Sequence, residues 1–459
     1  MARKLAQALG EFAANLRFSQ LPTAAIRTAK TGVIDCVAVM VAGSVELPVQ
    51  ILRKTLNGLG GVPEATLYLS AERMPAPDAA WINGMAGHVL DYDDFARGHP
   101  SVVIVPAILA EGEALDASGA DIVTAYVAGY EVWMELVTRE RGNYQMKGWH
   151  PTPLIGALAA AAACANLRRL DAAAVTAALG LAAAQASGIT ASYGTMAKSM
   201  QVGKAAHTGV ISVRMAADGM TALPEVLDHE QGFLRAVSPA GDVDVQSAPR
   251  LGERWHITER GLSIKRYPVC YCAHRAIDAT INLISRQPLE AEDIDRIEVS
   301  LSRIHATILK NHRPTTGLAA KFSAEFAVAA SVLAGNVGLQ EVNDAFVTRR
   351  EVQELMRRVT VVTNENYDPE APGFALWDQV HVFLKDSRVL ESEQVRHALG
   401  NAKRPLGTDD LRRKFLDCMA AGDQGFDAEQ LFRDLETLEH LASCRALAAR
   451  RRGPAAAAA

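Results

Sequence analysis

The sequence predicts a mainly α fold that contains a smaller α+β domain. Its 459 residues, 49% of them hydrophobic, exceed what one ordinary hydrophobic core accommodates. Over most of the chain the apolar residues recur at spacings of three and four, which is typical of amphipathic helices. After about residue 290 the spacing changes to two, which indicates half-buried strands. We therefore expect a large, discontinuous all-helical domain formed by residues 1–265 and 395–450, and an α+β lid domain formed by residues 266–394.

The predicted helices of the first domain are separated by Gly, Pro and Asp residues. Alanine dominates many of them. Because alanine is the best helix former and its side chain is small, we expect these helices to pack closely. The stretches predicted to be helical are residues 25–42, 79–90, 101–117, 119–138, 152–166 and 170–186.

The lid domain is predicted from alternation, in which Ile297, Val299 and Leu301 are separated by polar residues. Further strands are expected at residues 359–361, 380–384 and 388–390, with helices at 323–333 and from residue 340 onward. Two amphipathic helices, residues 408–420 and 427–448, then return the chain to the first domain. The last nine residues, 451–459, have no hydrophobic period, and we expect a disordered tail.

Composition excludes several classes of protein. The formal net charge is −5, and no Lys- or Arg-dense face is evident, so a nucleic-acid partner is not expected. The amino terminus has the pattern of an amphipathic helix rather than of a signal peptide. The most apolar run, residues 154–165, is about half the length of a membrane span. We therefore expect a cytoplasmic protein with no membrane partner.

The first segment that suggests chemistry runs from Gly87 to Ser101. Asp91, Asp93 and Asp94 follow one predicted helix, and His99 stands directly before the proline that begins the next. Clustered carboxylates raise the pKa of at least one member unless cations compensate. The alternative is that these residues only cap helices in a solvated acidic loop.

The second segment, residues 142–153, places Tyr144 and His150 in one short loop before an Ala-rich helix. Phenol and imidazole groups can each exchange a proton. A loop of capping residues explains the pattern equally well.

Two further segments supply cations. Residues 193–207 contain Lys198 and Lys204, which are candidate anchors for substrate carboxylates. Lys265 and Arg266 lie at the predicted domain boundary, where ligand clefts tend to form. The alternatives are surface charges for the two lysines and a basic hinge at the boundary.

In order and spacing, these segments resemble the MmgE/PrpD family. The resemblance covers roughly residues 15–400. The motifs that carry it are Leu21-Pro22, Val33-Ile34-Asp35-Cys36, Asp91-Tyr92-Asp93-Asp94, His99-Pro100-Ser101, Gly148-Trp149-His150-Pro151-Thr152, Gly194-Thr195-Met196-Ala197-Lys198, Lys265-Arg266-Tyr267-Pro268 and Lys321-Phe322-Ser323.

The resemblance implies a homodimer, a cleft between the domains, and neither a metal nor an organic cofactor. The implied site is Asp91, His99, His150, Lys198 and Lys265, to which we add Tyr144 as a candidate acid or base on its chemistry alone. The sequence departs from the family where Phe95 replaces a common threonine in a shortened acidic loop. Cys270 stands where the decarboxylases of the family have a histidine.

Proton chemistry beside a carboxylate is what the resemblance implies. Lys198 and Lys265, with Arg266, would bind a small di- or tricarboxylic acid and stabilise developing charge. His150 and His99 would form the acid and base, with Asp91 orienting one of them. The first expectation is dehydration of the 2-methylcitrate type. Alternatives are epimerisation of an iminodisuccinate-like diacid, decarboxylation of the cis-aconitate type, or an inactive helical scaffold.

Overall fold

The computed structural model describes residues 4–68, 70, 72–422 and 425–449, which form two compact units. Unit 1 comprises residues up to Val89, residues 93–262 and residues from 407 onward. Unit 2 comprises residues 90–92 and 263–406. The predicted tail, residues 451–459, lies outside the described residues.

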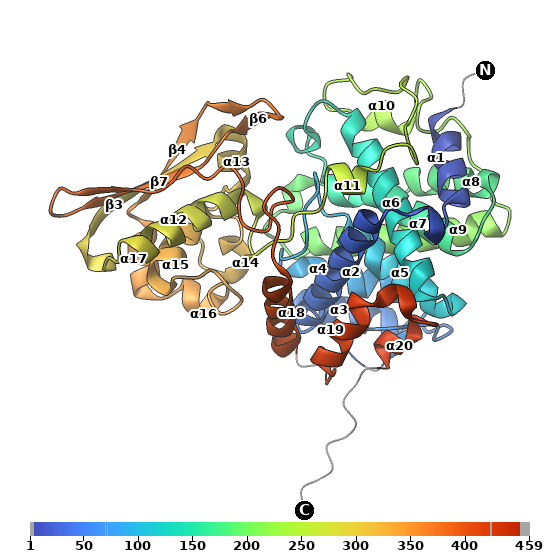
Figure 1. The fold of residues 1–459 in the computed structure, drawn as a ribbon, viewed down its shortest axis with the longest axis horizontal. Coiled ribbons are helices and arrows are strands. Elements are labelled where there is room, and N and C mark those ends of the chain that lie inside the picture. Colours follow the sequence, from blue (N-terminus) through green and yellow to red (C-terminus); the bar gives the residue numbers. More distant parts are fainter. Residues whose placement is uncertain (1–3, 69, 71, 423–424, 450–459) are drawn as a thin grey trace, which may run out of the picture. The chain divides into compact units, whose positions relative to one another are not determined.

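Unit 1 is built from helices (Figure 1), and its only described strands form one short hairpin, β1–β2, which the sequence did not predict. Its elements are α1 (Leu5–Asn15), α2 (Thr23–Gly43), α3 (Leu47–Asn57), β1 (Ala65–Thr66), β2 (Arg73–Met74), α4 (Ala76–Val89), α5 (Ser101–Leu115), α6 (Gly119–Arg139), α7 (Pro151–Leu167), α8 (Ala172–Ala183), α9 (Ala197–Ala217), α10 (Phe233–Val237), α11 (His256–Glu259), α18 (Thr408–Gly422), α19 (Ala428–Glu436) and α20 (Arg445–Ala448), with the 3₁₀ turns η1 (Phe18–Gln20), η2 (Tyr144–Lys147), η3 (Thr190–Ser192) and η6 (Leu438–His440).

The helix starts follow local sequence signals. Ser118 caps α6 by accepting a hydrogen bond from the Asp121 amide, and Asp171 caps α8 in the same way. Pro151 occupies the first position of α7, where its missing N–H is no loss. These signals explain why the predicted boundaries of α5 to α8 agree closely with the structure.

Helices α4 and α9 approach each other so closely that their backbones touch. A Cβ atom on Gly84 would lie 3.0 Å from the Cα of Gly203, and one on Gly203 would lie 2.2 Å from the carbonyl oxygen of Trp81. Only glycine fits at a contact of this kind. The two glycines therefore set the spacing between α4 and α9.

The last helices differ from the prediction of one continuous helix over residues 427–448. The chain leaves the helix after Glu436, because the backbone of the next segment pairs elsewhere. The Leu441 carbonyl accepts from the Gly119 amide, and the Cys444 amide donates to the Ala117 carbonyl. Tertiary hydrogen bonds therefore replace the helical ones that periodicity predicts.

A buried ion pair joins α18 to α2. The Lys414 Nζ atom lies 2.6 Å from Oδ1 of Asp35, and both side chains are almost wholly buried. We expect Lys414→Met to lower the free energy of unfolding by about 3–5 kcal/mol, because it leaves a buried carboxylate without this cation. Urea denaturation followed by circular dichroism measures the loss.

The matched control for this prediction is Lys403→Met, which removes the exposed ion pair with Glu370. An exposed pair contributes little, so this variant should unfold almost as the unmodified protein does. Equal denaturation midpoints for the two variants would contradict a stabilising role for the buried pair.

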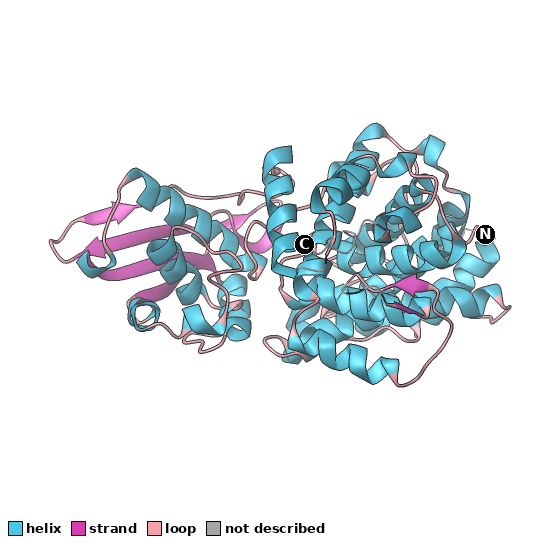
Figure 2. Cartoon of the chain, turned by 90° about the horizontal axis from the view of Figure 1, so that it is seen from below, coloured by secondary structure: helices cyan, strands magenta, loops and turns pink. Residues whose placement is uncertain are grey.

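Unit 2 contains a four-stranded mixed sheet in the order β4-β3-β7-β8. Strand β3 pairs parallel with β4 and antiparallel with β7, while α12 and α15 pack against the sheet (Figures 1 and 2). Its elements are η4 (Tyr271–Ala273), α12 (His274–Arg286), η5 (Ala291–Asp293), β3 (Ile294–Ser302), α13 (Arg303–Ile308), α14 (Gly317–Ala320), α15 (Ala324–Ala334), α16 (Asp344–Val347), α17 (Arg350–Met356), β4 (Val359–Asn364), β5 (Tyr367–Asp368), β6 (Ala371–Ala375), β7 (Gln379–Leu384) and β8 (Val389–Glu391).

The predicted fold class, mainly α with a smaller α+β part, is confirmed. In β3 the residues Ile297, Val299 and Leu301 are fully buried, as their alternation predicts. The helix expected from residue 340 begins only at Asp344, because the side chain of Asn343 caps it by accepting from the Phe346 amide.

The short segment Leu90–Tyr92 departs from the predicted domain boundary. It follows α4 directly but makes its contacts with unit 2. Asp91 has a left-handed backbone, with φ of 53°, and so breaks the helical path at this point. Periodicity carries no signal for such a crossing.

Among the described residues, no single helix is both long and apolar enough to cross a membrane. The pair α2 and α3 reaches the length and composition only when taken together, and the two helices are bent by 85°.

Candidate functional site

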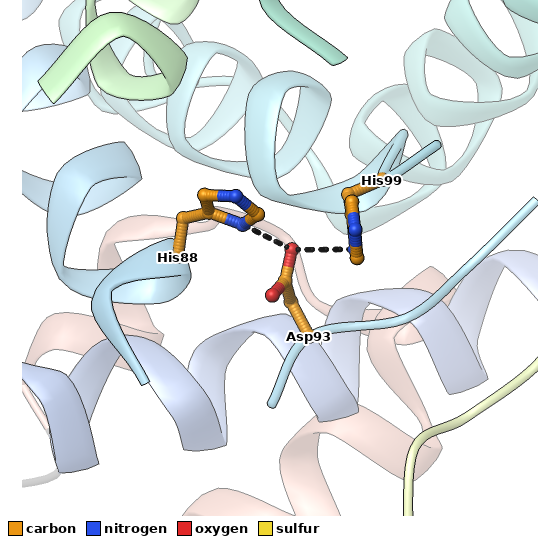
Figure 3. A group of neighbouring side chains, drawn as sticks. All are labelled: His88, Asp93 and His99. Carbon is orange, nitrogen blue, oxygen red and sulfur yellow. Dashed lines mark hydrogen bonds and ion pairs between the residues drawn. The ribbon is translucent and has the colours of Figure 1, made fainter. Parts of the chain in front are cut away.

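Three side chains from one segment of unit 1 form a hydrogen-bonded chain (Figure 3). His88 lies in the last turn of α4, and Asp93 and His99 lie in the loop between α4 and α5. The Oδ2 atom of Asp93 is 2.8 Å from Nδ1 of His88 and 3.2 Å from Nδ1 of His99. One carboxylate therefore links two imidazole rings, whose centroids are 4.9 Å apart.

The loop turns back on itself just before His99. Arg97 and Gly98 both have positive φ values, 59° and 143°. A Cβ atom on residue 98 would lie 2.8 Å from the Trp133 ring, so glycine is required there. Helix α5 starts at Ser101, and this turn therefore places the His99 imidazole beside the start of that helix.

Burial and neighbouring charges shift the pKa values of His88, Asp93 and Asp94. Burial alone would raise the pKa of Asp93, but the imidazoles of His88 and His99 outweigh it and hold that pKa well below its usual value. Burial lowers the pKa of His88 to about 4, against the opposing charge of Asp93. Burial also raises the pKa of Asp94 well above its usual value. At neutral pH, Asp93 is therefore ionised and His88 is neutral.

The position of the proton on His99 follows from its neighbours. Its Nδ1 atom lies 2.6 Å from the carbonyl oxygen of Asp94 and 3.2 Å from the carboxylate of Asp93. Both are acceptors, so Nδ1 carries a hydrogen. The Nε2 atom is left to exchange a proton, and the carboxylate stabilises the imidazolium that results.

A third imidazole, that of His150, is fully buried at the start of α7. Its ring centroid lies 5.8 Å from that of His88 and 4.9 Å from that of Tyr193. The Nδ1 atom of His150 is 2.8 Å from Nε2 of Gln201, on α9. His88, His99 and His150 therefore form one group of rings.

Lys198 adds a cation to this group. It lies in the first turn of α9, is only 7% exposed, and its ammonium nitrogen is 5.7 Å from the centroid of the Tyr193 ring. Its charge also contributes, after burial and the opposing effect of Asp93, to the low pKa of His88. Helices α5, α7 and α9 each begin within two residues of a member of this group, and helix N-termini favour bound anions.

Two predicted site residues, Asp91 and Lys265, lie in unit 2 and pair with each other. The Lys265 Nζ atom donates to the Asp91 carbonyl oxygen at 2.6 Å and lies 3.2 Å from its carboxylate. Both side chains are buried. The neighbouring Arg266 is exposed and lies over the Tyr267 ring, with 5.4 Å between its guanidinium carbon and the ring centroid.

Two other predicted residues are placed differently. Tyr144, in η2, is buried, and burial raises the pKa of its phenol. Within the described part of the chain its hydroxyl has no hydrogen-bond partner. Lys204 lies about 240° around α9 from Lys198 and so points to a different side of the helix. The Nζ atom of Lys204 is 4.4 Å from the centroid of the Trp81 ring and 2.9 Å from Nδ1 of His207. No described contact places Tyr144 or Lys204 against the three imidazoles.

The structure adds four residues that the sequence analysis did not assign to the site: His88, Asp93, Tyr193 and Gln201. A signal existed for the first two, because His88 and Asp93 lie in the same segment as His99. The contacts of Tyr193 and Gln201 with His150 join residues more than forty positions apart, and nothing local indicates them.

The ligand atoms of His88, Asp93 and His99 all lie within 4.8 Å of one another and are of the types that bind Zn²⁺. A metal-bound Nδ1 on His99 could not keep its hydrogen bond to the Asp94 carbonyl oxygen. The observed contacts therefore fit a hydrogen-bonded chain better than a metal centre. Chemically, this group can bind an anion beside a buried proton carrier.

Comparison with known proteins gives a consistent result. The family model described as the MmgE/PrpD N-terminal domain matches residues 7–246, and that of the MmgE/PrpD C-terminal domain matches residues 267–436. Similar curated proteins include the cis-aconitate decarboxylase of Homo sapiens, 26% identical over 83% of this chain and 80% of that protein. The cis-aconitate decarboxylase of Mus musculus is 27% identical over the same shares, and that of Aspergillus terreus is 26% identical over 88% and 87%.

Proposed function

This chain belongs to the MmgE/PrpD family, and we propose that it is a lyase that removes CO₂ from a small unsaturated tricarboxylic acid of the cis-aconitate type. The relatives named cis-aconitate decarboxylase support this reaction. The observation that carries it is the His99–Asp93 pair, which adjoins His88 in the same buried group as Lys198.

The proposed reaction breaks one C–C bond. The electron pair of that bond forms a new C=C bond as CO₂ leaves, and the pair of the old C=C bond moves to the carbon beside a remaining carboxylate. That carbon takes a proton. Lys198 and the helix N-termini hold the carboxylates and stabilise the developing charge, and His99 delivers the proton from Nε2.

Our sequence-based expectation placed dehydration of 2-methylcitrate first, and the comparisons favour the decarboxylase alternative instead. Elimination of water needs a base and an acid, whereas decarboxylation needs only a proton donor. The ring of Phe95 lies 5.7 Å from that of His99 and offers no hydrogen bond to a substrate hydroxyl. This apolar neighbour favours an unsaturated acid over a hydroxy acid.

The test is to incubate the full-length protein separately with ¹³C-labelled cis-aconitate, citrate and 2-methylcitrate in D₂O and to follow each by NMR. From cis-aconitate we expect CO₂ and a five-carbon unsaturated diacid that carries one deuterium taken from the solvent. From the two hydroxy acids we expect no loss of water. His99→Gln should abolish the product. Dehydration of 2-methylcitrate without CO₂ release would overturn the proposal.

A further inference from the structure

We propose that Gln201 is a positioning residue that keeps His150 neutral, with its hydrogen on Nε2. His150 then acts as a hydrogen-bond donor to the substrate rather than as its acid or base. The roles assigned here rest on the proposed function, whereas the protonation state of His150 does not.

The orientation of the Gln201 amide is fixed by the backbone of Ile189. The Oε1 atom accepts from the Ile189 amide at 3.1 Å, and Nε2 donates to the Ile189 carbonyl oxygen at 3.1 Å. An amide nitrogen has two hydrogens, so the second is available to Nδ1 of His150, 2.8 Å away. If the amide were reversed, its NH₂ would face the Ile189 N–H and its oxygen would face the Ile189 carbonyl oxygen. The observed orientation therefore places an N–H donor of Gln201 opposite Nδ1 of His150.

His150 is held against the same segment by its own backbone. Its amide donates to the carbonyl oxygen of Gly188 at 3.0 Å, and Trp149 forms a bridge with Ile189. Gly188 has φ of 129°, and a Cβ there would lie 2.3 Å from Pro153, so the segment needs glycine at this point. Both partners of the Gln201–His150 bond are therefore fixed to residues 188–189.

A donor at Nδ1 decides the state of the ring. Nδ1 must present its lone pair to Gln201, so the hydrogen of the neutral imidazole lies on Nε2. In a protonated ring, the Nδ1–H of His150 would face the N–H of Gln201, so two donors would oppose each other. The titratable groups near the His150 ring include His88 from α4 and Tyr193, with Lys198 over the Tyr193 ring. The positive charge of Lys198 further disfavours a second proton.

His99 has the opposite surroundings. Its Nδ1 faces two acceptors, one of them the ionised Asp93, which stabilises a positively charged ring. The two histidines therefore differ in kind: His99 can carry a proton, whereas His150 can stabilise negative charge on a substrate oxygen through Nε2–H, as a neutral imidazole does. One proton carrier is what a decarboxylation needs. The proposal differs from our expectation that His150 and His99 form an acid–base pair.

The protonation of His150 can be measured without substrate, using full-length protein labelled with ¹⁵N-histidine. Comparison with a His150→Phe variant identifies its signals. At neutral pH we expect an unprotonated Nδ1 and a protonated Nε2. In Gln201→Glu, the new carboxylate accepts from Nδ1–H, so both nitrogens should become protonated and the pKa of His150 should rise. A protonated Nδ1 in the unmodified protein would overturn the proposal.

Activity gives the second readout. We expect Gln201→Met to lower kcat by up to about 100-fold, the size of losing one well-placed donor to developing charge, because the hydrogen of the neutral His150 ring can then move to Nδ1. Gln201→Glu keeps a hydrogen on Nε2 and should lower kcat less. The control is Gln185→Met, on the same unit, where the side chain contacts Ser212 and the Leu181 carbonyl oxygen; its kcat should not change. Unchanged nitrogen signals in Gln201→Glu, together with an unchanged kcat in Gln201→Met, would overturn the role of Gln201. If no tested acid is turned over while the nitrogen signals are as expected, the proposed function fails and the Gln201 proposal stands.

Discussion

Replacing Asp93 by asparagine is expected to lower kcat by a factor of about 10³–10⁴, the cost of depriving a histidine of its carboxylate partner. The Oδ2 atom of Asp93 accepts from His88 and from His99. Asparagine has the same shape but presents one acceptor and one donor. The amide oxygen can still accept from both rings, but asparagine is neutral, so the positive form of His99 loses its stabilising charge. Turnover is measured as CO₂ release from cis-aconitate.

Asp94 provides a matched control, because it is equally buried and stands next in the chain. Burial raises the pKa of Asp94 well above its usual value, so Asp94→Asn should change the charge of the loop less than Asp93→Asn does. We expect the loss of turnover in Asp94→Asn to be far smaller, with unfolding midpoints for both variants close to that of the unmodified protein. Equal losses in the two variants would contradict the role given to Asp93.

Replacing Lys198 by methionine should reduce kcat/KM by about 10²–10³-fold. This is the cost of removing the cation from a buried pair between Lys198 and a substrate carboxylate. Methionine keeps much of the volume but cannot bind a carboxylate. Most of the loss should lie in KM if Lys198 only binds the substrate, and in kcat if it also stabilises developing charge. The pKa of His88 should rise, since burial lowers it to about 4 with a contribution from the charge of Lys198. Steady-state kinetics and histidine NMR measure the two effects.

The control is Lys204→Met on the same helix, where the lysine contacts Trp81 and His207. It removes the same charge from a different side of α9. We expect its kcat/KM to stay within about threefold of the unmodified value, as for a charge outside the site. A loss as large as that of Lys198→Met would show that net charge, rather than position, binds the substrate.

The fold could be predicted in outline because its signals are local. The helices of unit 1 have apolar spacing and caps such as Ser118 and Asp171, and β3 has clear alternation. The exceptions are tertiary. The predicted helix over residues 427–448 breaks where its backbone bonds to residues 117–119, and residues 90–92 join unit 2 through a backbone turn at Asp91.

The site could be predicted only where a residue stands at a helix start. His99, His150 and Lys198 do so, and they lie in one group. His88 was missed because α4 is apolar all round, and a histidine in such a helix looks like a core residue. Gln201 was missed because its contact with His150 depends on how α7 and α9 pack. Residue types also do not specify which bond breaks, so the sequence favoured dehydration where the relatives favour decarboxylation.

The contact between Gly84 and Gly203 limits how this site can be redesigned. His88 lies on α4, and Lys198 and Gln201 lie on α9. The two glycines therefore determine the distance between these groups by setting the spacing of the two helices. Libraries that seek a new substrate can include Phe95, whose ring lies beside His99, but a side chain at position 84 or 203 would force the two helices apart and shift the groups that they carry. The spacing of these two helices is therefore closed to engineering.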